Sequence, residues 1–210
     1  MKKLFLFVLV ASLMMSSAVY AKPVFGIKAG LNIASSTFSP LPDGVSKKSI
    51  LGFLVGGMIE APLTQDKSFG IRGDVGWVEK GVKFSGDNGF VKETVDELDF
   101  SPYLVYNISG IVENARPFVQ AGPEFGFVMS TNSHSEIDNV GTKDEDIKDA
   151  ASTDFSLNLG AGLGLPLHNK GEIVFDVHYC LGLTDMNDTS EVTAKLRSFL
   201  ICVGYNFPPK

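Results

Sequence analysis

Residues 154–165 read DFSLNLGAGLGL and alternate strictly between two kinds of side chain. The apolar set consists of Phe155, Leu157, Leu159, Ala161, Leu163 and Leu165. The intervening set consists of Asp154, Ser156, Asn158, Gly160, Gly162 and Gly164. Because successive side chains of a strand point to opposite faces, this period predicts a β-strand with one apolar and one polar face.

Seven further segments repeat this alternation. They lie at residues 25–33, 51–60, 69–77, 98–106, 119–127, 172–182 and 198–207. The sequence therefore predicts eight strands of roughly 9–13 residues, the length that a tilted strand needs to cross a bilayer. Hydrophobic residues make up 44% of the chain, yet no apolar run after residue 21 approaches the roughly 18 residues of a transmembrane helix. This combination favours a soluble β fold or a transmembrane barrel.

The connections alternate in length along the chain. Those at residues 37–49, 85–97, 131–152 and 184–194 are long and polar. Those at residues 62–68, 107–116 and 166–171 are shorter. This asymmetry is typical of an all-β, eight-stranded antiparallel up-and-down barrel with long extracellular loops and short periplasmic turns. An even number of strands then predicts that both mature termini are periplasmic.

The N-terminus has the layout of a secretory signal peptide. Lys2 and Lys3 precede an apolar run from Leu4 to Met15, and Val19-Tyr20-Ala21 supplies small residues at a cleavage site. We predict a cleaved signal peptide at residues 1–21, a barrel at residues 22–207 and a short tail at residues 208–210. The chain without residues 1–21 keeps all 24 acidic residues and loses two of its 18 basic ones. Its acidity makes nucleic acid an improbable partner.

The alternation does not say which face is inside, because a lipocalin-like soluble carrier has the same period with the opposite orientation. Three features favour an outward apolar face. The polar face carries most strand glycines, which relieve crowding in a narrow barrel. It also carries charges of both signs, each of which would cost roughly 2–4 kcal/mol against lipid at mid-membrane. Third, the sequence shows no C-terminal helical segment of the kind that covers one end of a soluble barrel. The charges are Lys28, Arg72 and Lys80 with Glu60, Asp74, Asp99, Glu124, Asp154, Glu172 and Asp176.

Several stretches resemble the outer-membrane β-barrel domain family of PorT-like "porin family" proteins, which are OmpA/OmpX-type eight-stranded barrels. They are Phe25-Gly-Ile-Lys-Ala-Gly-Leu-Asn32, Glu60-Ala-Pro-Leu63, Trp77-Val-Glu-Lys-Gly81, Leu98-Asp-Phe-Ser-Pro-Tyr-Leu104, Pro117-Phe-Val-Gln-Ala-Gly-Pro123, Asp154-Phe155 with Gly160-Ala-Gly162, Tyr179-Cys-Leu-Gly-Leu183 and Gly204-Tyr-Asn-Phe207. The resemblance implies an outer-membrane barrel, often without an assigned activity. It also implies insertion by machinery that reads the last strand, here Phe199, Ile201, Val203, Tyr205 and Phe207. The chain departs from the family in ending Pro208-Pro209-Lys210.

Two groups of residues offer alternative chemistry. His178 with Asp176 and either Ser101 or Ser156 resembles part of a hydrolase site, but there is no nucleophile-elbow or zinc-protease motif. We therefore predict an inward histidine in a polar network. Acidic residues of the third long loop lack EF-hand spacing, so we predict a solvated acidic loop. The alternative is that these residues hold divalent ions that bridge to lipopolysaccharide. That loop contains His134, Glu136, Asp138, Asp144, Glu145, Asp146 and Asp149.

The two cysteines lie on neighbouring predicted strands with the same facing. A symmetric last hairpin places Cys180 opposite Arg197, which leaves Cys202 about five residues further along, roughly 16 Å away at strand rise. Bridged Cα atoms lie within about 7 Å, so this register favours free thiols over a disulfide. The aromatic residues, including the lone Trp77, are predicted to form interfacial girdles.

The function predicted from these features is a structural, surface-interaction or adhesion-type role. A rigid barrel with a largely plugged lumen would anchor the long loops in contact with outer-membrane lipid and lipopolysaccharide. The loops would meet an extracellular or host ligand, and the protein would be a monomer. A narrow cation-preferring pore and a lipid-modifying enzyme are the alternatives. We predict no enzymatic activity, and the sequence assigns no catalytic, cofactor-binding or metal-binding residues.

Overall fold

A computed structural model describes residues 22–39, 44–87, 89–110, 112–137, 141–146, 152–168, 170–185 and 193–209. The predicted signal peptide and the last residue of the predicted tail lie outside these residues. Among the described residues, no helix is long and apolar enough to cross a membrane.

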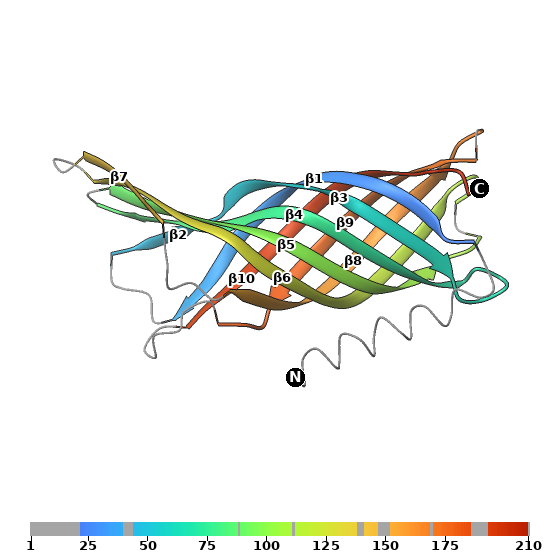
Figure 1. Ribbon diagram of the computed structural model, residues 1–210, viewed down its shortest axis with the longest axis horizontal. Helices are drawn as coiled ribbons and strands as arrows, with labels where there is room; N and C mark the ends of the chain where they lie inside the picture. The colour runs from blue at the N-terminus through green and yellow to red at the C-terminus, as the bar shows by residue number, and fades with distance from the viewer. Residues whose placement is uncertain are drawn as a thin grey trace.

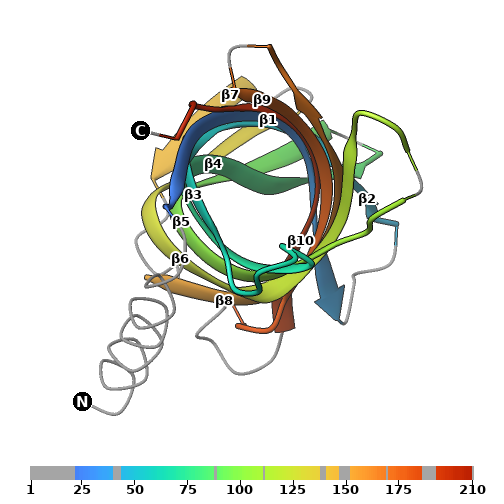
Figure 2. The same ribbon diagram turned by 90° about the vertical axis from the view of Figure 1, so that its right-hand side faces the viewer.

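The described chain forms ten strands, of which eight close into a ring (Figures 1 and 2). The strands are β1 (Val24–Ser39), β2 (Ser46–Lys48), β3 (Ile50–Pro62), β4 (Phe69–Gly86), β5 (Gly89–Asn107), β6 (Arg116–Ile137), β7 (Gly141–Asp146), β8 (Thr153–Pro166), β9 (Glu172–Gly182) and β10 (Thr193–Asn206). The ring order is β4-β3-β1-β10-β9-β8-β6-β5, and β5 pairs with β4 to close it. All pairings are antiparallel. The predicted eight-stranded up-and-down barrel is confirmed.

Two connections predicted to be long loops are largely strand. The predicted loop at residues 85–97 is a hairpin, because β4 continues to Gly86 and β5 begins at Gly89. Most of the first half of the predicted loop at residues 131–152 is also paired, since β6 extends to Ile137 and β7 folds back on it. The ring strands consequently run from 11 to 22 residues, longer than predicted. Backbone pairing does not require apolar side chains, so these polar strands gave no hydrophobic signal.

The long strands continue the same sheet beyond the barrel, as seen at the left of Figure 1. We call this the projecting sheet: residues 79–86 of β4, 89–96 of β5 and 130–137 of β6, with β2 and β7. β2 pairs with β4 at one edge of it and β7 pairs with β6 at the other. The C-terminus lies at the opposite end of the barrel.

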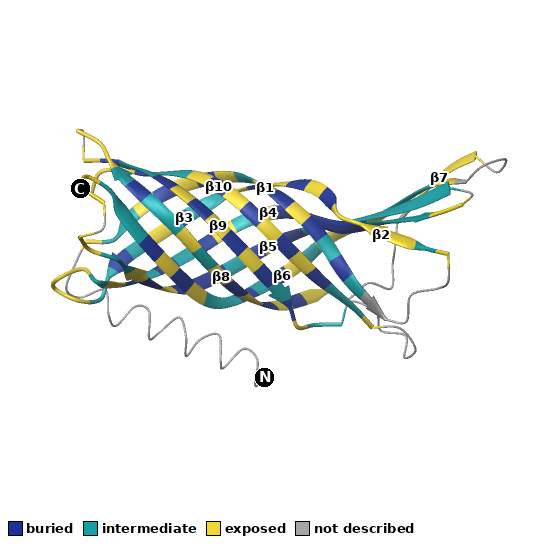
Figure 3. Cartoon of the chain, turned by 180° about the vertical axis from the view of Figure 1, so that it is seen from behind, coloured by how far each residue is buried: buried dark blue, intermediate teal, exposed yellow. Residues whose placement is uncertain are grey.

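Exposure alternates along the ring strands, and Figure 3 shows the resulting chequered pattern of exposed and buried residues. In β8, Leu159 is 50% exposed whereas Asn158 is 2% exposed. Leucine, valine, isoleucine and phenylalanine residues of the other ring strands are exposed in the same way, while charged residues such as Arg72 and Lys80 are buried. The apolar face therefore points outward, as predicted, and the polar face fills the lumen.

The outward apolar surface has a sharp boundary at the base of the projecting sheet. Trp77 is paired with Leu98, and Leu98 is paired with Phe127, so the three share one outward row. The next outward row toward the projecting sheet contains Glu79, Asp96 and Ser130. At the other end, aromatic pairs mark the second boundary: Phe69 with Tyr106 at 5.0 Å between ring centroids, and Tyr205 with Phe207 at 5.3 Å. This arrangement fits the predicted aromatic girdles.

Candidate functional site

The polar lumen is the candidate functional site, and its charged side chains gather in three layers along the barrel axis. The cations are Lys28, Arg72, Lys80 and Arg116. The carboxylates are Glu60, Asp74, Glu97, Asp99, Glu124, Asp154, Glu172 and Asp176. These layers thus contain four cations and eight carboxylates.

The layer nearest the projecting sheet surrounds Lys80, which is 2% exposed. Its Nζ lies 2.8 Å from Glu97 Oε2, 3.0 Å from Asp99 Oδ2 and 3.0 Å from Glu124 Oε1. Asp154 Oδ2 lies 3.9 Å away. Buried charges require partners of opposite sign, and one ammonium here serves four carboxylates. Glu97 Oε1, Asp99 Oδ1 and Asp154 Oδ1 are buried without a hydrogen-bond partner.

A glycine on β6 makes room for this layer. A Cβ atom on Gly126 would lie 2.5 Å from Glu97 Oε2 and 2.9 Å from Asp99 Oδ1. Real Cβ atoms do not approach other atoms this closely, so any other residue would force both carboxylates to move. This supports the interpretation that glycine on the polar face relieves crowding in a small barrel.

The middle layer is balanced in charge. Lys28 Nζ donates to Asp74 Oδ2 at 2.6 Å, and Arg72 Nε donates to Asp74 Oδ1 at 2.8 Å. Arg72 also reaches Asp176 Oδ2 at 3.1 Å. His178 Nε2 lies 2.6 Å from the other oxygen of Asp176. Cations and carboxylates therefore bind strands β1, β4 and β9 together across the lumen.

The third layer closes the end of the barrel that carries the termini. Arg116 bridges Glu60 and Glu172, each at 2.7 Å. Arg116 also donates to Asn107 Oδ1 at 2.8 Å, and Asn206 donates to Glu172 at 2.9 Å. Outside this layer lies a cavity of about 490 Å³. It is lined by Glu60, Arg116 and Glu172, by Lys67 and Lys170 of the turns, and by Lys22, which precedes β1.

Space between the layers is small. The cavity bounded by Asp74, Asp99, Glu124 and His178 has a volume of about 20 Å³. One water molecule needs at least about 10–15 Å³ measured in this way. Side chains therefore leave little free space at this point of the lumen.

The structure brings together the charged residues that the sequence placed inside, but two members of the network were missed. Glu97 was assigned to the end of a loop, and Arg116 was assigned to a turn. Both continue the inward alternation of their strands: Glu97 is two residues before Asp99, and Arg116 is two residues before the buried Phe118. Continuing the alternation of inward and outward residues into each predicted connection would have placed Glu97 and Arg116 in the lumen.

The residues of the hydrolase hypothesis do not converge on one another. His178 contacts Asp176 as predicted, and it also lies within 3.3 Å of Asn158 and Gln120. Ser101 Oγ instead donates to Glu124 at 3.2 Å, and Ser156 Oγ donates to Asp154 at 2.9 Å. A nucleophile activated by histidine requires direct hydrogen-bond contact between the two, and both hydroxyls are directed at carboxylates.

The acidic segment predicted as a loop is divided between strands and residues that are not described. His134 Nδ1 lies 2.6 Å from Asp144 Oδ1 across the β6–β7 pair, and Glu136 is opposite Thr142. Glu145 and Asp146 belong to β7, opposite Ser133 and Asn132. Asp138 and Asp149 lie outside the described residues. The described part of the segment is exposed to solvent as predicted, but it is a strand pair and not a loop.

Both cysteines are free and buried. Cys180 is opposite Ser198 and Cys202 is opposite Asp176, which separates the two thiols by four residues along the hairpin. The predicted pairing of Cys180 with Arg197 is wrong by one residue. The pleat explains the error, since an inward residue must face another inward residue, whereas Arg197 is exposed outward.

Comparisons with known proteins agree with this architecture. A family model described as "Outer membrane protein beta-barrel domain" matches residues 22–188. No curated protein matches the sequence. Among solved structures, the outer membrane protein OprG from Pseudomonas aeruginosa is similar with a TM-score of 0.51 and 11% identity, over 91% of this chain and 99% of that one. Its low identity shows a shared barrel fold and no more.

Two further solved structures are similar at lower scores. Neisserial surface protein A has a TM-score of 0.46 and 13% identity, over 87% of this chain and 95% of that one. The attachment invasion locus protein Ail of Yersinia pestis has a TM-score of 0.44 and 16% identity, over 89% of this chain and 99% of that one. The family match spans more than half of the sequence, and the ring and its outward apolar face agree with it. The chain belongs to the outer membrane protein β-barrel domain family and is an integral β-barrel protein of the outer membrane.

Proposed function

We propose that this protein is a non-enzymatic surface-contact protein, in which a plugged barrel holds the projecting sheet outside the cell. The observation that carries the proposal is the projecting sheet itself. Its strands continue about eight residues past the Trp77 boundary, roughly 26 Å along each strand. A barrel that served only as an anchor would need no paired extension of this length.

The plugged lumen supports the same role. Ion pairs link opposite walls of the barrel in three layers, and such links resist relative movement of the strands. A rigid base keeps the projecting sheet in one orientation, which lowers the entropy lost when the sheet contacts a partner. The strand edges at β2 and β7 offer backbone groups for such contact, as edge strands commonly do.

The proposed orientation places the projecting sheet outside the cell and both termini in the periplasm. Short turns connect the strands at the end that carries the termini, which is the arrangement of outer-membrane barrels. The barrel, as a monomer, would be surrounded by lipid and lipopolysaccharide. An extracellular or host ligand would meet the projecting sheet.

Labelling of intact cells tests the orientation. Thr142→Cys places a thiol on exposed β7, and Asp66→Cys places one in the short turn between β3 and β4. A membrane-impermeant maleimide added to whole cells should label the first variant and spare the second, and both should react after lysis. Labelling of Asp66→Cys alone in intact cells would show the inverted orientation.

A shortened variant tests the contact role. Gly81 and Thr94 are paired in β4 and β5, so replacing residues 82–93 by Asn-Gly removes the tip of this hairpin and closes it at a natural pair. Cells displaying equal amounts of either protein are compared for attachment to immobilised extracellular-matrix glycoprotein. The proposal predicts at least a tenfold loss for the shortened variant. Equal attachment would mean that the projecting hairpin is not the contact surface.

Recording of ionic current separates this proposal from the narrow-pore alternative. The excess of carboxylates in the lumen would make any conducting path favour cations. The plugged barrel is expected to carry no steady single-channel current in a planar bilayer. A stable cation-selective current through the unmodified protein would favour the pore.

A further inference from the structure

Asp176, His178 and Cys202 place three different ligand atoms at one point of the lumen. Their carboxylate oxygen, imidazole nitrogen and thiol sulfur all lie within 4.8 Å of one another, and all three residues are buried. The strand register creates this group. Asp176 and His178 are two residues apart on β9 and share its inward face, and Cys202 is directly opposite Asp176 on β10. We infer that these three residues form a binding site for a borderline-soft divalent transition metal, with Zn²⁺ as the best match.

The donor set determines the class of metal. Zinc is bound by cysteine sulfur, histidine nitrogen and carboxylate oxygen, and three protein ligands with one open position are common for it. Calcium and magnesium select oxygen ligands and would disfavour a thiolate and an imidazole. The oxygen ligands around Lys80 therefore do not suit zinc, whereas the mixed donor set of Asp176, His178 and Cys202 does.

The hydrogen-bond partners of His178 allow the tautomer in which Nε2 can bind a metal ion. Asn158 Nδ2 donates to Glu124 Oε2 at 2.9 Å, which fixes the orientation of the Asn158 amide. The Asn158 oxygen then faces His178 Nδ1 at 3.2 Å, where it can accept the proton of that nitrogen. The Gln120 amide nitrogen lies 3.3 Å from the same Nδ1 and 3.2 Å from Nε2. In the tautomer with the proton on Nδ1, Nε2 is available as a metal ligand beside Asp176 Oδ1, which is 2.6 Å away.

The same contacts supply the outer partners that a metal site needs. A metal-bound histidine usually donates its other N–H to a carbonyl or carboxylate, and Asn158 fills that place. The second oxygen of Asp176 accepts from Arg72, which leaves Oδ1 for the metal. Metal binding would widen the separation of Nε2 and Oδ1 to about 3.4 Å, the spacing of two ligands around a tetrahedral ion.

Arg72 already pairs with Asp176, but the charged layers of the lumen as a whole carry more carboxylates than cations. The middle layer is balanced by its own ion pairs, and the neighbouring Lys80 layer carries four carboxylates against one ammonium. A divalent ion that displaces the thiol proton of Cys202 adds one net positive charge beside this negative excess. The inference is independent of the proposed surface role, because it concerns the lumen alone.

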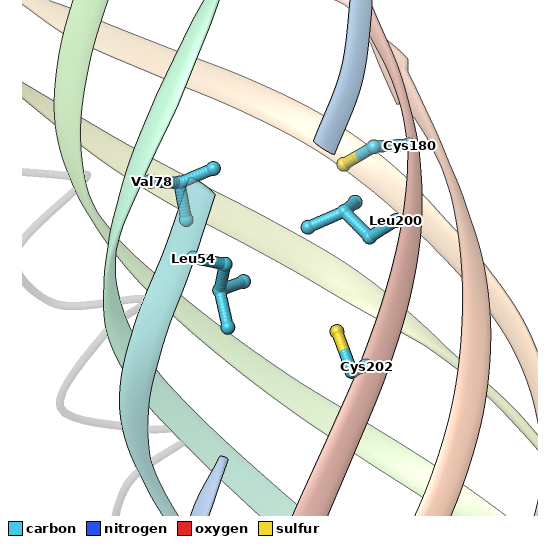
Figure 4. Close-up of a cluster of buried hydrophobic side chains, with 5 residues drawn as sticks. All are labelled: Leu54, Val78, Cys180, Leu200 and Cys202. Atoms are coloured by element: carbon cyan, nitrogen blue, oxygen red, sulfur yellow. The ribbon is translucent and has the colours of Figure 1, made fainter. Parts of the chain in front are cut away.

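Cys180 provides a matched control for Cys202. Figure 4 shows both thiols directed into the lumen, with Leu200 between them. Both are buried, and Cys180 Sγ donates to Glu124 and belongs to no such three-ligand group among the described residues. Replacing either cysteine by serine removes one buried sulfur, but only Cys202→Ser removes a proposed ligand.

The experiment is a metal titration of the mature protein folded in detergent. Co²⁺ reports thiolate ligation through a sulfur-to-metal charge-transfer absorption band, and Zn²⁺ should displace it with a stoichiometry of one. The band should persist in Cys180→Ser and vanish in Cys202→Ser, with Zn²⁺ affinity at least tenfold lower in the latter. Excess Ca²⁺ should leave the band unchanged. Loss of the band in both variants, or in neither, would overturn the assignment.

A measurement on the unmodified protein guards against misfolding of the variants. X-ray absorption at the zinc edge should show one sulfur at about 2.3 Å and nitrogen or oxygen ligands at about 2.0–2.1 Å. Zinc surrounded by oxygen alone would place it on the Lys80 layer or at the surface. Protein folded in the presence of Zn²⁺ that contains no zinc after purification would show that the three residues do not bind the metal. Either result refutes the site.

Discussion

Replacing Lys80 by methionine tests the most crowded part of the lumen. Methionine keeps much of the volume of the lysine stem, so the change removes the ammonium with little loss of packing. Three carboxylates within 3.0 Å would then have no cation of their own. Removing one partner from a buried ion pair costs about 3–5 kcal/mol, because the remaining charge stays buried without compensation. We expect Lys80→Met to lower the free energy of unfolding by at least this amount.

A surface lysine of the same protein supplies the control. The side chain of Lys92 is 37% exposed, and its Nζ lies 3.9 Å from Glu79 Oε1, its one carboxylate partner among the described residues. Exposed ion pairs contribute about 0–1 kcal/mol. Lys92→Met should therefore change stability by no more than about 1 kcal/mol.

Denaturant unfolding in lipid vesicles measures both variants, with the folded fraction read from the mobility of unheated samples on SDS gels. The deficit of Lys80→Met should shrink as the pH falls, because protonation neutralises the carboxylates that have lost their cation. A difference of less than about 1 kcal/mol between the variants would refute the account of Lys80 as the charge that holds this layer together. A deficit that grows with acidification would refute its electrostatic origin.

Two further pairs of substitutions test the facing and the packing of the strands. Leu159→Arg places a charge on the outward face at mid-strand and should cost roughly 2–4 kcal/mol of folding free energy. Asn132→Arg lies on the outward face of the projecting sheet and should leave the folded fraction in outer membranes unchanged. Equal depletion of both variants would count against the boundary at Trp77. Gly126→Ala pushes a Cβ atom into Glu97 and Asp99 and should lower the free energy of unfolding by about 1–3 kcal/mol. Gly73→Ala is the control, because its Cβ atom would meet only ordinary contact with Ile59 at 3.5 Å. Equal unfolding midpoints for the two glycine variants would show that the lumen is looser than described.

The barrel was predictable because its defining constraint is local. A strand between lipid and a packed lumen must alternate residue by residue, and residues 154–165 carry that alternation without interruption. The facing of Lys28, Arg72 and Lys80 followed from the same parity. Their partners across the lumen did not follow, since those depend on how far each strand is shifted against its neighbours.

The projecting sheet was missed because it lies outside that constraint. In water, both faces of a strand can be polar, and residues 131–136 of β6 are all hydroxyl, amide, imidazole or carboxylate side chains. Pairing there is directed by the backbone and by hairpin closure, which leave no hydrophobic period. Longer strands also moved Glu97 and Arg116 from predicted connections into the lumen.

The proposed metal site shows how much depends on register. Asp176, His178 and Cys202 were all placed on inward faces by the sequence. The symmetric hairpin would have put Cys202 opposite outward Phe175, whereas a shift of one residue puts it opposite Asp176. A pairing rule that matches inward with inward residues excludes the wrong register from the sequence alone.

The central claim is that the outward face meets lipid, and the single tryptophan reports on it without any substitution. Trp77 is 38% exposed and lies in the last apolar row below the projecting sheet. Its fluorescence should be recorded in vesicles of lipids brominated at different depths along the acyl chain. We expect strong quenching that is greatest for bromines near the headgroup, and weak quenching by aqueous iodide. Insensitivity to brominated lipid together with strong quenching by iodide would contradict the membrane-barrel account.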